Sequence, residues 1–201
     1  MPPRLLAGRP APAMAAEEGA GAGRASGGPV ISQIATPRFV LRAVEAGDVD
    51  ALLPAFCDPD AMRYWSRGPF DNRAQFAEWL LDASWGGRTW VAVPKAGGDP
   101  VARLVASEAR PGVAEIGYLV LPGHARQGIG GECVAALVTH LFRAEGYSRV
   151  FADTDPRNTP SNRLLQRLGF TREAHLRSAM ETHIGWCDTW LWGVLADEWR
   201  H

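Results

Sequence analysis

The sequence predicts an α+β fold in which helices pack on a mixed, mostly antiparallel sheet. Two strand-like runs, 89–94 and 101–109, are joined by Gly97-Gly98-Asp99, which is a hairpin signal. A third apolar run, 114–121, continues through a glycine-rich turn into an amphipathic helix. Strands joined by tight turns and interrupted by single helices indicate a sheet with helices on its faces.

The first part of the predicted domain holds one strand and two helices. The strand covers 38–42, and Asp48 is expected to cap the helix that follows. The apolar residues of that helix recur at helical spacing: Val49, Leu52, Leu53 and Phe56. A second helix runs from about Asn72 to Asp82 and has its own apolar side: Phe76, Trp79, Leu80 and Ala83.

After the glycine turn the sequence alternates between helix and strand. A helix begins near Ile129 and shows the i, i+3, i+4, i+7 spacing of a buried face. A strand at 149–153 leads into a helix that Asn158 caps and Gly169 ends. Two strands, around 172–178 and 188–195, complete the predicted sheet.

Composition is that of one soluble globular domain. The 201 residues are 46% hydrophobic and 21% charged with a net charge of −1, so we expect no nucleic-acid-binding surface. No stretch approaches the about 18 apolar residues of a membrane helix. The three cysteines are far apart and no His-x-x-x-His pair occurs, so we expect no disulfide framework, no metal and a cytoplasmic protein. Cys133 falls on a predicted buried face and is expected to be a structural thiol.

Residues 1–30 differ in composition from the rest of the chain. They are rich in Ala, Gly and Pro and show no hydrophobic periodicity, so we expect a disordered tail followed by one domain over 31–201. Glu17 and Glu18 interrupt the basic residues of this tail, and no long apolar segment follows. The tail is therefore a poor match for a signal peptide.

The glycine-rich turn has the chemistry of a phosphate site. Gly128 and Gly130 lie where a helix begins, and the first N–H groups of a helix lack intrahelical acceptors and lie at the positive end of its dipole. Glycine lets an anion approach the main chain because no Cβ intervenes; a plain strand-to-helix turn is the alternative. The turn matches neither of two other phosphate-binding motifs. Gly131 and Glu132 stand where a P-loop has Lys and Ser/Thr, and Cys133 stands where a dinucleotide-binding fingerprint has its third glycine.

On these residues the sequence resembles the GCN5-related N-acetyltransferases (GNAT family). Residues 120–122 and 126–131 match the acetyl-CoA signature, a strand ending in Val-x-Pro and then a basic turn with Gly-x-Gly, although Ala125 stands where Arg or Gln is expected. A second block, 158–170, resembles the family's second CoA-contacting helix. The resemblance covers about residues 34–200. It is greatest to the RimJ/RimL-like branch, because further residues match that branch: 36–42, Glu132, Asp188, Glu198 and Trp199.

The resemblance implies how acetyl-CoA binds. In this family the strand before the glycine turn splays from its neighbour, and the pantetheine arm pairs with exposed main chain in the gap. That strand end is here Tyr118, Leu119 and Val120, where a free N–H would also stabilise an oxyanion. The remaining expected CoA contacts lie in the turn and at the second helix: Arg126, Gln127, Gly128, Ile129, Gly130, Gly131, Asn158 and Ser161.

Acetyl transfer requires a base for the ammonium and an acid for the departing thiolate. Ser161 is the expected acid by resemblance to the Asn-x-x-Ser branch, since Leu165 occupies the position of the tyrosine used by other relatives; a hydroxyl that satisfies helix amides is the alternative role. Glu115 is the expected base, because acidic residues on this strand serve as base in other branches. Further candidates, each also suited to a surface ion pair, are Asp153, Asp155, Glu173 and His175.

Tyr64 and Trp65 lie between the two N-terminal helices, in the segment that forms the acceptor lid of the family. An aromatic wall there would bind a cationic amine by cation–π contact, and simple packing is the alternative. We therefore expect an N-acetyltransferase that moves acetyl from acetyl-CoA to a primary amine, on a protein N-terminus or a small molecule, as a monomer or homodimer. The alternative is a catalytically silent acyl-CoA sensor.

Overall fold

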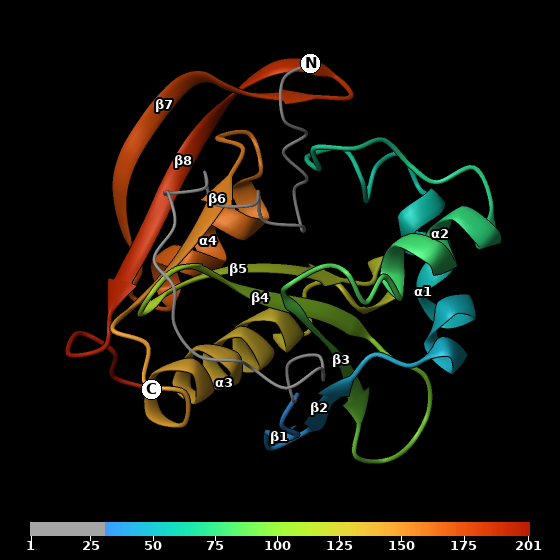
Figure 1. Ribbon diagram of the computed structural model, residues 1–201, viewed down its shortest axis with the longest axis horizontal. Coiled ribbons are helices and arrows are strands. Elements are labelled where there is room, and N and C mark those ends of the chain that lie inside the picture. The colour runs from blue at the N-terminus through green and yellow to red at the C-terminus, as the bar shows by residue number, and fades with distance from the viewer. Residues whose placement is uncertain (1–30) are drawn as a thin grey trace, which may run out of the picture.

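The computed structural model describes residues 31–201, which form an eight-stranded sheet with helices on both faces (Figure 1). The strand order is β1-β2-β3-β4-β5-β6-β8-β7, and every neighbouring pair is antiparallel except β5 and β6. This arrangement confirms the predicted α+β fold. The expected tail, 1–30, lies outside the described residues.

The bounds of the elements follow the predicted order. The strands are β1 (Ile34–Ala35), β2 (Phe39–Ala43), β3 (Arg88–Pro94), β4 (Ala102–Arg110), β5 (Val113–Val120), β6 (Arg149–Thr154), β7 (Thr171–Thr182) and β8 (Gly185–Leu195). The α-helices are α1 (Val49–Cys57), α2 (Arg73–Leu80), α3 (Ile129–Arg143) and α4 (Thr159–Arg167), and two short 3₁₀ helices are η1 (Ala46–Asp48) and η2 (Pro122–His124). None of the helices from Ile31 onward is long and apolar enough to cross a membrane.

Two separate cores lie on the two faces of the sheet. Side chains alternate along a strand, so Trp90 of β3 contributes to the core beneath α3 and α4, whereas Val91 contributes to the core beneath α1 and α2. The first core is centred on the apolar face of α3, including Leu137 and Leu141. The second is strongly aromatic, with rings drawn from α1, α2 and the segment between them: Phe56, Trp65, Phe70 and Phe76.

The parallel pair β5–β6 separates after a short contact. Its register joins Val113–Glu115 to Arg149–Phe151 and ends there. On the other side, β4 pairs with β5 as far as Val120. The second half of β5 therefore turns one main-chain edge toward a gap that opens between β5 and β6, which confirms the predicted splayed pair.

The C-terminal strands are longer than predicted and form one continuous hairpin (red in Figure 1). The prediction ended the first strand near Ser178, where the register shifts and Ser178 adopts a left-handed φ of 47°. The carboxylate of Asp188 accepts a hydrogen bond from the Ser178 amide at 2.9 Å, which holds this irregularity in the ladder. A bulge of this kind interrupts the polar alternation by which a strand is recognised.

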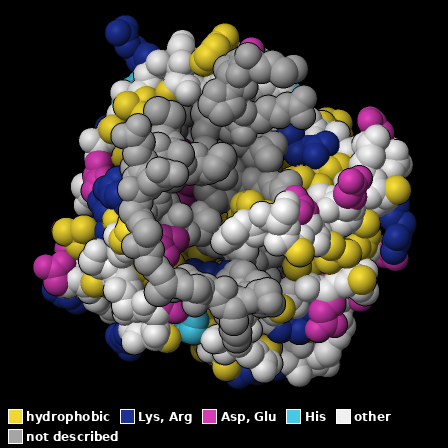
Figure 2. All heavy atoms as spheres, in the orientation of Figure 1, with side chains coloured by type: hydrophobic (Ala, Val, Ile, Leu, Met, Phe, Trp, Pro, Cys, Tyr) yellow, Lys and Arg dark blue, Asp and Glu magenta, His cyan; other side chains and the backbone are white. Residues whose placement is uncertain are grey.

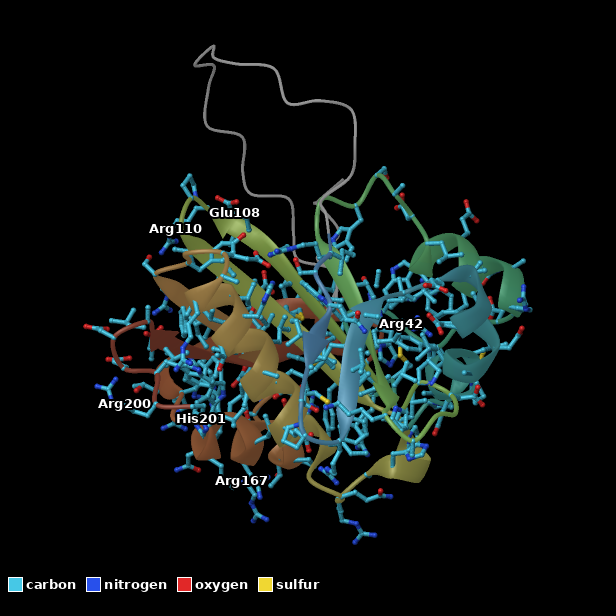
Figure 3. All side chains as sticks on the ribbon, turned by 90° about the horizontal axis from the view of Figure 1, so that it is seen from below. Arg42, Glu108, Arg110, Arg167, Arg200 and His201 are labelled. Atoms are coloured by element: carbon cyan, nitrogen blue, oxygen red, sulfur yellow. The ribbon has the colours of Figure 1, made fainter. Side chains whose placement is uncertain are left out.

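Asp48 does not cap α1 with its side chain, in contrast to the prediction. Its carboxylate instead binds the Arg42 guanidinium, at 2.7 Å from Nη2, and accepts the Glu45 amide at 2.8 Å. Arg42 lies on the same side of the molecule as α1, away from Arg200 and His201 (Figure 3). The ion pair thus joins β2 to the start of α1. Asn72 and Asn158 are side-chain caps, as predicted for Asn158.

Asn162 anchors α4 to the sheet through a buried polar cluster. Its Oδ1 accepts hydrogen bonds from Thr154 Oγ1 at 2.5 Å and Trp192 Nε1 at 3.0 Å. Its Nδ2 donates to the carbonyl oxygens of Asp155 and Pro156 at 3.1 and 3.2 Å. One side chain therefore fixes the first turns of α4 against β6 and β8.

We expect Asn162→Ala to lower the free energy of unfolding by about 2–3 kcal/mol, because it leaves buried donors and acceptors unpaired. Urea denaturation measures the loss. Asn72→Ala is the matched control, since it removes an exposed cap worth about 1 kcal/mol. A cost for Asn162→Ala no larger than that of the control would contradict the assignment of a structural anchor.

Candidate active site

The unpaired edge of β5 lies at the centre of the candidate site. Tyr118, Leu119 and Val120 pair with β4 opposite Leu104, Arg103 and Ala102, and their other edge borders the gap toward β6. All three are partly exposed. They lie where an extended ligand can add main-chain hydrogen bonds to the strand, which is the geometry that the proposed pantetheine contact needs.

The turn from β5 to α3 contains two residues in the left-handed region. Arg126 has φ 62° and Gly128 has φ 76°, and both are exposed together with Gln127. An arginine rarely adopts this conformation, because its Cβ crowds the carbonyl oxygen. Such strain is typical of ligand-binding turns. The exposed turn therefore offers backbone amides and one cation next to the α3 N-terminus.

The three glycines of the turn differ in backbone conformation and in what surrounds them. Gly128 supplies the left-handed conformation at the N-cap of α3. A Cβ on Gly130 would lie 2.7 Å from Leu164 Cδ1 and 3.4 Å from Val120 Cγ2, so this glycine allows α3 to pack closely against α4 and β5. Gly131 faces open space. Ile129 is buried in the core beneath α3.

Glu132 ties the start of α3 to the N-terminal strands. Its carboxylate accepts hydrogen bonds from Thr36 Oγ1 at 2.6 Å, from the Arg38 amide at 2.8 Å and from Arg38 Nε at 2.6 Å. Arg38 Nη1 also donates to the Gln127 carbonyl oxygen at 3.0 Å. Burial acts to raise the pKa of Glu132, but these donors outweigh it and keep the pKa below its usual value. We call this set of contacts the Glu132 clamp.

The two halves of the clamp are separate matches in the sequence, and their contact is not predicted from it. They are separated by 94 to 96 positions in the chain. Neither periodicity nor local spacing reports a pairing over that distance. The clamp adds Arg38 to the residues that shape the turn.

Ser161 and Tyr118 meet across the junction of α4 and β5. The Tyr118 hydroxyl lies 2.7 Å from Ser161 Oγ, and the Ser161 amide is held by Asn158 Oδ1 at 3.3 Å. Burial raises the pKa of Tyr118 well above its usual value, so the phenol keeps its proton. Ser161 and Asn158 are predicted CoA contacts, whereas the prediction uses only the main chain of Tyr118. The structure therefore brings the expected acid to the edge of the gap with a phenol beside it.

An acidic floor lies on the opposite face of the sheet, beneath the α1–α2 side. Glu115 pairs in register with Ser107 of β4 and Phe151 of β6, and Asp153 follows Phe151 on the same face. Burial, and then the charge of Asp153, raise the pKa of Glu115 to about 7. Solvent reaches Asp153, yet surrounding protein still raises its pKa. Both carboxyl groups thus hold a proton more readily than a free carboxyl group does.

Ser107 adds an unsatisfied polar atom to this floor. The residue is 7% exposed, and its hydroxyl has no hydrogen-bond partner within residues 31–201. A buried hydroxyl without a partner is costly, unless water or a ligand satisfies it. Nothing in the sequence distinguished this serine from others in a strand.

The other candidate bases are each paired with a neighbouring side chain. Asp155 binds Arg157 at 2.6 Å, and although burial acts to raise the pKa of Asp155, these contacts lower it. Glu173 is paired with Arg149, which lowers the pKa of Glu173. His175 lies 2.7 Å from an oxygen of Asp188 on the β7–β8 hairpin. These residues have the surface pairing that was their alternative role.

Tyr64 and Trp65 lie in the loop between α1 and α2. Trp65 is 8% exposed and packs edge-on against Phe56 with ring centroids 5.4 Å apart, while Tyr64 is partly exposed. The Trp65 carbonyl lies 3.1 Å from Nδ1 of His183, which joins this loop to the turn of the β7–β8 hairpin. In Figure 2 hydrophobic side chains gather on the surface over α1 and α2. The loop and hairpin together border the acidic-floor side of the molecule.

Over residues 31–201, no group of three or more His, Cys, Asp or Glu side chains is arranged to hold a metal ion. Cys133 is fully buried, and burial raises the pKa of its thiol to about 12. It is therefore a packing residue of α3, as predicted.

Comparison with known proteins agrees with this geometry. The model of the acetyltransferase (GNAT) domain matches residues 38–171. The uncharacterized N-acetyltransferase p20 of Bacillus licheniformis is 28% identical over 170 residues, which cover 81% of this chain and 96% of that protein. The crystal structure of a probable GNAT acetyltransferase from Chromobacterium violaceum is 26% identical, with a TM-score of 0.77 over 94% of this chain and 98% of that one.

A solved structure of RimL, the ribosomal L7/L12 α-N-protein acetyltransferase in complex with coenzyme A, is also similar. It is 20% identical with a TM-score of 0.70, covering 83% of this chain and 99% of that one, which supports the shared fold. The splayed strands and the glycine turn both lie within the residues that the family model matches. The chain belongs to the GNAT family of acetyltransferases, which transfer acetyl from acetyl-CoA.

Proposed function

We propose that this enzyme acetylates a primary amine by direct attack of the amine on acetyl-CoA in a ternary complex. The observation that carries the proposal is the gap at the second half of β5. The glycine turn and Ser161 lie on one side of this strand, and Glu115 lies on the other. A thioester bound in the gap would therefore have the proposed acid, Ser161, on one side. The amine and its proposed base, Glu115, would lie on the other side.

The expected cofactor contacts divide into two groups. The main chain of Tyr118, Leu119 and Val120 would bind the pantetheine arm and polarise the thioester carbonyl. The turn and the α3 N-terminus would bind the pyrophosphate through backbone amides, with Arg126 as a nearby cation. The contributing residues are Arg126, Gln127, Gly128, Ile129, Gly130 and Gly131, together with Asn158 and Ser161 of the α4 start.

Glu115 is the base that we propose, and the floor around it supports this choice. A pKa of about 7 lets a carboxylate accept a proton from an ammonium near neutral pH and release it again to solvent. Asp153 keeps a second negative charge close by, which favours a cationic acceptor. The unsatisfied Ser107 hydroxyl would orient the amine or a bridging water. Ser161 is the acid that we propose for the departing sulfur.

The acceptor belongs to the broad class of amines that the RimJ/RimL-like branch takes, either a protein N-terminus or a small molecule. Tyr64 and Trp65 remain the proposed aromatic side of its site. The buried packing of Trp65 favours a role in shaping the loop, whereas the partly exposed Tyr64 is the better ring for direct contact. We propose a cytoplasmic enzyme that acts as a monomer or homodimer, without nucleic acid or membrane as partners.

Amine-dependent turnover is the direct test of the proposed function. The purified protein should release free CoA thiol from acetyl-CoA when a diamine or a peptide with a free N-terminal alanine is added. A catalytically silent sensor would bind acetyl-CoA in calorimetry and return it unchanged with either amine. That outcome would refute the enzymatic proposal while leaving the cofactor site intact.

The glycine turn can be tested by a matched pair of substitutions. We expect Gly128→Ala to weaken acetyl-CoA binding about 10-fold, because a left-handed alanine costs roughly 1–2 kcal/mol and distorts the turn. Gly47→Ala, in η1 and outside the proposed cofactor contacts, should bind within about twofold of wild type, since its Cβ meets open space. Isothermal calorimetry measures both dissociation constants. Equal weakening by the two variants would contradict the turn-specific role.

The proposed base predicts a pH dependence. Because the Glu115 carboxylate must be ionised to accept a proton, kcat/KM should fall as pH drops through about 7. Glu115→Gln should lower kcat at pH 8 by about 100-fold and remove the inflection near 7. Glu108→Gln is the control, because Glu108 is an exposed residue of β4 (labelled in Figure 3). A retained inflection in Glu115→Gln would assign it to another group.

Asp153→Asn tests the coupling within the acidic floor. Removing this negative charge favours the ionised form of Glu115, so the Glu115 pKa should decrease. The inflection in the kcat/KM profile should therefore move to lower pH. An inflection that stays in place, or moves to higher pH, would show that Asp153 does not set the Glu115 pKa.

A further inference from the structure

The Tyr118 hydroxyl is a titratable group at the β5–α4 junction to which the proposed mechanism gives no task. We propose that Tyr118 is a positioning residue that directs the Ser161 hydroxyl proton into the gap and strengthens Ser161 as an acid. This inference rests on the proposed function, because it concerns the proton that the departing sulfur receives. It assigns a side-chain role to a residue whose main chain alone had been expected to matter.

Both oxygen atoms are fixed by rigid elements. Tyr118 lies in β5 opposite Leu104 of β4, so its backbone is set by the continuous β4–β5 ladder. Ser161 lies in the first turn of α4, whose start is held by the Asn158 cap and by the buried Asn162 cluster. The two oxygens are 2.7 Å apart, which is the usual length of a hydroxyl–hydroxyl hydrogen bond. The contact therefore joins two well-anchored side chains.

The direction of this hydrogen bond follows from the acceptors within reach. If Tyr118 donates to Ser161 Oγ, the Ser161 proton is left to point elsewhere. If Ser161 donated instead, the Tyr118 proton would have to turn to the Ser161 carbonyl oxygen at 3.5 Å, which is long for a hydroxyl donor. Burial also keeps Tyr118 protonated, as a donor must be. The geometry thus favours Tyr118 as donor and Ser161 as acceptor.

The chemical consequence concerns the departing sulfur. As the amine nitrogen forms its bond to the carbonyl carbon, Glu115 takes a proton from that nitrogen. The C–S bond breaks, its electron pair stays on sulfur, and the Ser161 hydroxyl gives its proton to the sulfur. Ser161 then recovers a proton from water. A hydrogen bond from Tyr118 stabilises the negative charge that develops on the Ser161 oxygen, which makes the serine a stronger acid.

Single-turnover acetyl transfer with saturating acetyl-CoA and amine tests this role through a double-mutant cycle. We expect Tyr118→Phe to lower the rate about 10-fold and Ser161→Ala to lower it about 100-fold. The double variant should be no slower than Ser161→Ala alone, because Tyr118 acts through Ser161. The acetyl-CoA dissociation constant and the amine KM of Tyr118→Phe should match the wild type. Tyr147→Phe, which removes a half-buried phenol beside Arg88, is the control and should be fully active.

Three results would overturn the inference alone. A fully active Tyr118→Phe would show that the hydroxyl is dispensable. A double variant about 1000-fold slower than wild type would show that the two hydroxyls act independently. A rate loss matched by weaker acetyl-CoA binding or a lower Tm would assign Tyr118 a structural role. A different result would refute the proposed function, and this inference with it. In that case the wild-type protein would bind acetyl-CoA but release no CoA thiol with either the diamine or the peptide.

Discussion

The early end of the β5–β6 ladder is the constraint on which the rest of the structure depends. Three residues of each strand pair in parallel, and the strands then separate. A parallel pair in the middle of a sheet normally continues, because a backbone amide that is buried without a partner is costly. Here the open edge is maintained by elements packed on both faces. An extended ligand that pairs with this edge would restore the missing hydrogen bonds, so the interrupted ladder is also the proposed binding site.

Several contacts between distant segments surround the gap. The close approach of α3 to α4 at Gly130, the Glu132 clamp and the Tyr118–Ser161 hydrogen bond all lie around the exposed end of β5. They connect the N-terminal strands, the glycine turn and α4. The turn and the gap are therefore organised by contacts within the protein. Preorganisation of this kind reduces the entropy that is lost when a long flexible molecule binds.

Local patterns determined which parts of this arrangement were predictable. The face of α3, the Asn158 cap and the left-handed Gly169 stop are encoded within a few residues, and the structure agrees with each. Contacts across the chain, such as Arg38 with Glu132, leave no such pattern. Asp48 was misassigned because a helix cap and a buried ion pair use the same residue type. The Ser178 bulge broke the alternation that would have revealed the full β7–β8 hairpin.

The alternation of side chains along β5 explains how one strand can serve both proton transfers. Glu115 and Tyr118 are three positions apart, so they lie on opposite faces of the sheet. Both have raised pKa values because protein surrounds them, yet burial has opposite consequences for their use. It makes the carboxylate a better proton acceptor near neutral pH, and it keeps the phenol protonated as a hydrogen-bond donor. In the proposed mechanism the strand separates base from acid, so that the proton from the amine and the proton for the sulfur follow different paths.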